Sequence, residues 1–152
     1  MSRTRSPKSR GFAAIGLHRS KDNVNVGSAL RACGVYDAAF CAVSERKYRK
    51  NASDTMKAFR HTPLFQVKDL KGIVPYDCVP VAVDIIPGAT PLPEYKHPER
   101  AFYIFGPEDG TLGKDITDWC RDVVYIPTER CMNLGATVNV ILYDRMSKRS
   151  KK

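Results

Sequence analysis

Short apolar stretches recur along this chain, and polar or helix-like segments separate them. Six stretches have the length and apolar content of buried strands, and they cover residues 12–17, 38–43, 63–67, 79–85, 101–105 and 123–126. The segments that favour helix cover residues 26–35, 54–59, 68–73, 116–120 and 132–146. Strands that alternate with helices are typical of α/β domains, so the pattern predicts an α/β fold.

The positions of the prolines and the length of the chain indicate how it is organised. Residues 86–100 are rich in proline, which lacks the amide hydrogen that regular elements use, so this segment is predicted to be a loop. The chain has 152 residues, the size of one domain. We expect that domain to cover residues 11–146, between basic tails at residues 1–10 and 147–152.

The net charge of +9 is concentrated at the two ends of the chain. Residues 1–10 carry four cations and no acid, residues 145–152 carry five cations and no acid, and the remainder balances. Basic arms fit a partner with a phosphate backbone, because flexible cations gain affinity by releasing counterions. The alternative is that the arms only make the protein soluble, and charge alone does not decide between the two.

Cysteine and histidine usage argues against disulfide and metal frameworks. The five cysteines are odd in number, widely spaced and contain no Cys-x-x-Cys pair, and the three histidines are scattered. This pattern favours reduced thiols in a cytoplasmic protein without a metal site. No apolar run approaches the roughly 20 residues that span a bilayer, so no membrane partner is expected.

Two common phosphate-binding loops are excluded by the residues present. Gly113-Lys114 follows a predicted strand, but a P-loop needs glycine where Glu108 stands and Ser or Thr where Asp115 stands. No Gly-x-Gly-x-x-Gly follows any predicted strand, so a Rossmann dinucleotide loop is absent as well.

Three segments carry a recognisable order of polar residues and glycines. They are Asn-Val-Gly-Ser-Ala-Leu-Arg at 25–31, Phe-Gly-Pro-Glu-Asp-Gly at 105–110, and Ile-Pro-Thr at 126–128 with Cys-Met-Asn-Leu at 131–134. The last segment leads into a helix that ends Ile-Leu-Tyr-Asp at 141–144. Together, from residue 12 to residue 144, they resemble the SpoU/TrmH class of the SPOUT superfamily of RNA methyltransferases.

The residues themselves allow a physical interpretation of these segments. Asn25 is a plausible cap for the helix at 26–35, and Arg31 is expected in its first turn, where anions are favoured. Gly106 lets backbone pass close to a ligand. Asn133 can cap the last helix. Each also has a purely structural alternative: Arg31 as a surface cation, and Asn133 as a helix cap and nothing more.

The resemblance implies a fold, a cofactor and an oligomeric state. The fold is a parallel-sheet α/β core with a C-terminal trefoil knot, the SPOUT α/β knot. The cofactor is S-adenosyl-L-methionine, held largely by main-chain groups. Carried over by position, the cofactor-binding residues are Val83, Gly106, Ile126, Cys131 and Met132. Members of the class are typically homodimers.

The resemblance also implies an activity, with Arg31, Glu108 and Asn133 as its catalytic residues. The expected reaction is methylation of a ribose 2′-hydroxyl, which restricts the substrate to RNA, and tRNA is favoured over rRNA. Arg31 would pair with a neighbouring phosphate, while Glu108 and Asn133 would hold it in place. The alternatives are a base-nitrogen methyltransferase of the same superfamily and a non-catalytic RNA-binding protein of the same fold.

We expect no separate RNA-binding domain, so the basic stretch at residues 46–50 and the two basic tails are expected to supply much of the grip on RNA. The residues expected to bind RNA are Asn25, Arg46, Lys47, Arg49 and Lys50.

Two features depart from the pattern of the class. The loop between Ile-Pro-Thr at 126–128 and Cys131 is short, with only Glu129 and Arg130 in it. Cys131 stands where serine is usual, and a thiol is a weaker hydrogen-bond donor than a hydroxyl.

Overall fold

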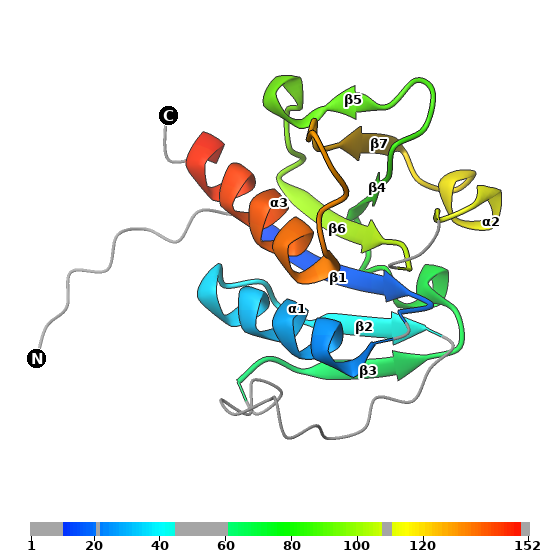
Figure 1. Ribbon diagram of the computed structural model, residues 1–152. Coiled ribbons are helices and arrows are strands. Elements are labelled where there is room, and N and C mark those ends of the chain that lie inside the picture. Colours follow the sequence, from blue (N-terminus) through cyan, green and yellow to red (C-terminus); the bar gives the residue numbers. More distant parts are fainter. Residues whose placement is uncertain (1–10, 21, 45–60, 108–110, 150–152) are drawn as a thin grey trace, which may run out of the picture.

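The computed structural model describes residues 11–20, 22–44, 61–107 and 111–149. In this part of the chain one sheet contains seven strands, all parallel, in the order β3-β2-β1-β6-β4-β7-β5 (Figure 1). The strands are β1 Phe12–His18, β2 Cys41–Ser44, β3 Leu64–Val67, β4 Val79–Val83, β5 Thr90–Pro91, β6 Arg100–Phe105 and β7 Asp122–Tyr125. The α/β fold with a parallel sheet is therefore confirmed. The threading of the C-terminal knot stays a prediction.

Two long helices cover one face of this sheet. Helix α1 spans Asn23–Val35 and helix α3 spans Leu134–Arg149, and they pack against each other side by side (Figure 1). The shorter helical segments are α2 Lys114–Thr117, η2 Leu70–Ile73 and η3 Leu92–Glu94. The close approach of α1 and α3 depends on Gly135, because a Cβ there would lie 2.6 Å from the Cβ of Ser28.

The sheet is buried on both faces, as the continuous apolar strands require. Along β6 the alternation is complete: Tyr103 and Phe105 face the core under α1 and α3, whereas Phe102 and Ile104 face a second core that contains Ile116 of α2. Successive strand residues point to opposite faces, so every strand except the two-residue β5 contributes side chains to both cores.

The start of helix α1 differs from the sequence prediction. Asp22, not Asn25, caps the helix, because its carboxylate accepts the Val24 N–H at 2.8 Å. Aspartate is as good a cap as asparagine and comes first in the chain. The prediction of a cap at Asn25 is wrong, and Arg31 lies eight residues after the helix start, about 12 Å along the axis and not in the first turn.

The proline-rich segment 86–100 is more regular than predicted. It contains the short strand β5 and the turn η3, and Pro91 is tolerated because β5 lies at the edge of the sheet, paired only with β7. Helix α3 begins two residues later than predicted and continues three residues into the segment expected to be a tail.

Two cations of the C-terminal segment make internal bonds and do not belong to a free basic arm. Arg145 is buried and donates to the backbone oxygens of Pro98 and Glu99, both at 2.6 Å. Lys148 pairs with Asp144 at 2.8 Å. Lys148 also donates to the Tyr95 backbone oxygen at 2.8 Å, so both cations attach α3 to the segment before β6.

Candidate functional site

The carboxyl ends of three neighbouring strands define the site. In the register of the sheet Val83 of β4 lies beside Phe105 of β6 and beside Val124 of β7, so these strands end at nearly the same level. Each end is followed by a loop, and in open parallel sheets ligands bind in the crevice outside such ends. The topology therefore brings three loops to one edge.

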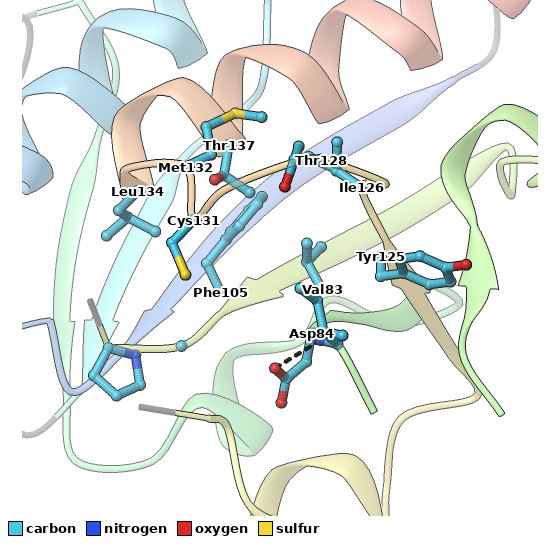
Figure 2. A pocket seen from close by; sticks show the side chains of 13 residues that line it. Val83, Asp84, Phe105, Tyr125, Ile126, Thr128, Cys131, Met132, Leu134 and Thr137 are labelled. Atoms are coloured by element: carbon cyan, nitrogen blue, oxygen red, sulfur yellow. Dashed lines mark hydrogen bonds between the residues drawn. The ribbon is translucent and has the colours of Figure 1, made fainter. Parts of the chain in front are cut away.

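A cavity of about 190 Å³ lies between these loops and the start of α3. Its lining comes from the loops after β4, β6 and β7 and from the first turn of α3 (Figure 2). The described residues that line it are Val83, Asp84, Ile85, Phe105, Gly106, Pro107, Tyr125, Ile126, Thr128, Cys131, Met132, Leu134 and Thr137. Apolar side chains dominate, with a few polar groups among them, which is the usual make-up of a small-molecule site.

All five residues predicted to bind a cofactor lie in this cavity. Val83, Gly106 and Ile126 follow or end their strands, while Cys131 and Met132 precede α3 (Figure 2). The residues are far apart in the sequence, and the parallel sheet brings them together.

Gly106 allows a close approach between two loops at the cavity. A Cβ at this position would lie 3.3 Å from both Cγ and the backbone nitrogen of Leu112. The side chain of Leu112 is buried, so it has little room to give way. A side chain at position 106 would therefore push the returning loop away from the end of β6.

Sequence reasoning missed several lining residues, and Asp84 is the most informative of them. Its carboxylate oxygens accept the Ile85 N–H at 2.9 Å and the Leu112 N–H at 3.1 Å, so the side chain joins the loops after β4 and β6. The available signal was an acid near the end of an apolar stretch, but a single residue of this kind has no motif around it. Thr137 was missed because it lies one turn inside the last helix.

Asn133 acts as the cap of α3. Its side-chain oxygen accepts the Ala136 N–H at 2.8 Å, and its backbone oxygen accepts the Thr137 N–H and hydroxyl, both at 2.9 Å. The cap fixes the first turn of α3, which contributes Leu134 and Thr137 to the cavity. The predicted capping role is confirmed, whereas a catalytic role remains a prediction.

Arg31 lies on α1, outside the cavity lining, and its side chain is exposed. It is one turn beyond Ser28, the residue that touches Gly135 at the start of α3. The structure thus places Arg31 and Asn133 on two packed helices. Asn25 lies in the first turn of the same helix, partly exposed.

Five of the predicted site residues lie outside the described part of the chain. They are Glu108 of the predicted catalytic set and Arg46, Lys47, Arg49 and Lys50 of the predicted RNA-binding set.

A second polar cluster lies on the side of the sheet where β1 and β6 begin. His97 Nδ1 lies 2.7 Å from the Tyr103 hydroxyl and its Nε2 lies 2.7 Å from Asp144, while Arg145 donates to the Tyr103 oxygen at 3.1 Å. Burial lowers the pKa of His97, against the opposing effect of Asp144, and burial raises the pKa of Tyr103 to about 12. A neutral His97 that accepts from Tyr103 and donates to Asp144 satisfies all of these bonds.

The described residues show neither a metal-binding cluster nor a membrane-spanning helix. Among them, no three or more His, Cys, Asp and Glu side chains gather in a way that could hold a metal ion. None of the helices in that part of the chain combines the length and the apolar character that a membrane crossing requires.

Comparison with known families now identifies the fold family. The model of the SpoU rRNA Methylase family matches residues 13–143. This chain belongs to the SpoU rRNA methylase family. No curated protein sequence gives a significant match.

Solved structures share the fold at low sequence identity. AviRb from Streptomyces viridochromogenes, a SpoU methyltransferase in complex with AdoMet, superposes with a TM-score of 0.81 and 18% identity, over 96% of this chain and 64% of that chain. The A. aeolicus TrmH/SpoU tRNA modifying enzyme gives 0.81 and 15%, over 91% of this chain and 76% of that one.

A third structure, from work on 2-OH methylation of C/U34 on tRNA, has nearly the length of this chain. Its TM-score is 0.79 at 17% identity, over 94% of this chain and 99% of that one. AviRb is longer, and in its cofactor-free structure this chain spans 60% of its length. At these identities the structural likeness establishes the fold.

Proposed function

We propose that this protein is an S-adenosyl-L-methionine-dependent RNA methyltransferase that methylates a ribose 2′-hydroxyl, with tRNA as the favoured substrate. The observation that carries the proposal is that one cavity, at the ends of β4, β6 and β7, is lined by all five residues predicted to bind the cofactor. Membership of the SpoU family supports the reaction class. The relative linked to tRNA 2-OH methylation, which matches this chain in length, supports the choice of tRNA.

The chemistry of the cavity fits this cofactor. Ile126 and Leu134 offer apolar surface for a flat adenine ring, and backbone groups at the strand ends can pair with its edge. A volume of about 190 Å³ is below the roughly 300–1,000 Å³ of pockets that bury a whole drug-sized ligand, so part of the bound molecule would remain outside. RNA must reach the transferred methyl group, which an entirely enclosed cofactor would prevent.

The bound cofactor would supply an activated methyl group, and the protein would supply alignment. Val83, Gly106, Ile126 and Met132 would hold it through their backbones, which the level strand ends and the Asn133 cap keep in place. Cys131 would contribute its side chain at the same wall of the cavity.

Arg31 would act on the RNA and not on the cofactor. A guanidinium keeps its protons at neutral pH, so it is suited to pair with a phosphate beside the target ribose and to stabilise developing alkoxide charge. Its position on α1, beside the start of α3, supports a place next to the cavity. Glu108 and Asn133 would complete the catalytic set by holding the loops around Arg31.

The RNA grip would come from Asn25 on α1 and from the basic residues Arg46, Lys47, Arg49 and Lys50. Cations spaced in this way neutralise phosphates, and a loss of affinity with rising salt is their signature.

A homodimer would complete the assembly, with α1 and α3 in its interface. Val35, Tyr143 and Met146 on these helices are exposed apolar residues, which supports this proposal. The cytoplasmic location expected from the sequence stays part of the same proposal.

Calorimetry with S-adenosyl-L-methionine, followed by methyl transfer to tRNA transcripts, tests the proposal. We expect the wild type to bind the cofactor and transfer methyl, and Arg31→Lys to bind with similar affinity but without transfer. Near-normal transfer by Arg31→Lys would refute the role of that residue. Absence of cofactor binding by the wild type would favour a non-catalytic RNA-binding protein. A methyl group on a base nitrogen would favour the other branch of the superfamily.

A further inference from the structure

The cavity contains one charged side chain among its described residues, and it is Asp84. The rest of that lining is apolar or neutral, from Val83 and Phe105 to Thr128 and Thr137. A carboxylate in such surroundings is costly unless it is paired or hydrogen-bonded. The hydrogen bonds that hold the Asp84 carboxylate therefore decide what else it can bind.

Asp84 is held rigidly but is not fully used by the protein. Its two oxygens accept one backbone N–H each, from Ile85 and from Leu112 (Figure 2 marks the first). Its own N–H donates to the Val124 oxygen at 3.0 Å, which continues the pairing of β4 with β7. Among the described residues no Lys, Arg or His forms an ion pair with it. A carboxylate oxygen accepts about two hydrogen bonds, so each oxygen keeps acceptor capacity.

We propose that Asp84 binds the vicinal ribose hydroxyls of the cofactor's adenosine through its two carboxylate oxygens. This inference rests on the proposed function of the cavity. A carboxylate only accepts hydrogen bonds, and a vicinal diol presents two O–H donors side by side, which match its two oxygens. Hydrogen bonds to a charged carboxylate are stronger than those between two neutral groups.

The other donors of the cofactor match Asp84 less well. The sulfonium carries charge but has no hydrogen to donate. The α-ammonium is next to an α-carboxylate, which Asp84 would repel. The adenine amine presents both hydrogens on one nitrogen, and backbone oxygens at the strand ends can accept them.

Calorimetry with 5′-methylthioadenosine tests the inference, because this molecule has the adenosine but neither the sulfonium nor the amino-acid end. The 2′-deoxy and 3′-deoxy forms each remove one hydroxyl. We expect wild-type affinity to fall about 10-fold for each, the scale of one hydrogen bond to a charged group. In Asp84→Asn an NH₂ donor replaces one of the two acceptor oxygens. The loss of affinity on removing a ribose hydroxyl, here called the deoxy penalty, should therefore fall to about 2-fold or less for at least one of the two hydroxyls.

Asp69→Asn is the matched control. The Asp69 carboxylate also accepts a backbone N–H two residues ahead, from Lys71 at 3.1 Å, but Asp69 does not line the cavity. This variant should keep both deoxy penalties at their wild-type size.

Three results would overturn the inference. The first is wild-type protein that binds the deoxy forms as tightly as 5′-methylthioadenosine. This result needs no variant, so it would overturn the inference even if Asp84→Asn failed to fold. Unchanged deoxy penalties in Asp84→Asn would mean that Asp84 only joins the two loops. If Asp84→Asn bound S-adenosyl-L-methionine more weakly than the wild type but bound 5′-methylthioadenosine equally well, Asp84 would lie at the sulfonium or amino-acid end of the cofactor. Failure of the wild type to bind either molecule would be a failure of the proposed function itself.

Discussion

Replacement of Arg145 by methionine should destabilise the protein strongly, because this cation is buried and satisfies several acceptors. It donates to the Pro98 and Glu99 oxygens at 2.6 Å and to the Tyr103 hydroxyl at 3.1 Å. A hydrogen bond to a charged group contributes about 1.5–3 kcal/mol, and such contributions are not additive. We expect a loss of about 3–5 kcal/mol, because Arg145→Met removes several hydrogen bonds from one charged donor at once.

Urea denaturation followed by circular dichroism measures this loss directly. The matched control is Arg121→Met, because Arg121 is 61% exposed and pairs with Asp122 at 3.2 Å, an arrangement worth at most about 1 kcal/mol. Total stability of a domain is about 5–15 kcal/mol, so the two variants should separate clearly. A loss below about 1 kcal/mol for Arg145→Met would refute the assignment of Arg145 as an internal clamp.

Three further predictions concern other parts of the structure. Burial lowers the pKa of His97, although the hydrogen bond to Asp144 opposes this, so the folded protein binds this proton less readily than the unfolded chain. The stability that a neutral His97 contributes should therefore be fully present above the unfolded pKa of about 6.5 and should fall as the pH drops below it. In urea titrations at several pH values, His97→Gln should make this fall smaller. Parallel stability–pH curves for the wild type and the variant would contradict this. Gly135→Ala should lower the free energy of unfolding by about 1–3 kcal/mol, because its Cβ would lie 2.6 Å from that of Ser28. Adding Ser28→Gly to the same chain should recover most of this loss. No recovery would contradict the assignment of the loss to this contact. Cys131→Ser should retain methyl transfer in a tRNA assay, since serine is usual at this position; a loss would give the thiol a role of its own.

The sheet could be predicted from the sequence because it depends on an apolar pattern that extends over many residues, whereas the cofactor-binding role of the cavity residues stays a prediction. Apolar strands separated by helices leave few alternatives to a parallel sheet, and that sheet places residues 83, 106 and 126 at one edge. The motif resemblance then named Cys131 and Met132, which complete the same cavity.

Local competition between similar residues explains the error at helix α1. Asp22 and Asn25 are both good caps, and the choice depends on which one has extended backbone when the helix forms. Sequence patterns do not fix that backbone, so the helix start and the position of Arg31 within it were misplaced.

Tertiary context explains the features that the sequence did not reveal. Arg145 and Lys148 look like part of a basic tail, but α3 continues through them and aligns them with backbone oxygens of the segment before β6. Asp84 acquires its significance only when the Leu112 N–H arrives from another loop. Neither relationship leaves a periodic or motif signal in the sequence.

The most direct test of the proposed function is nucleoside mass spectrometry of tRNA transcripts incubated with the purified protein and S-adenosyl-L-methionine. We expect a 2′-O-methylated nucleoside with the wild type and none with Arg31→Lys, although this variant should still bind the cofactor. A methyl group found on a base, or the same 2′-O-methylated product from Arg31→Lys, would contradict the proposal.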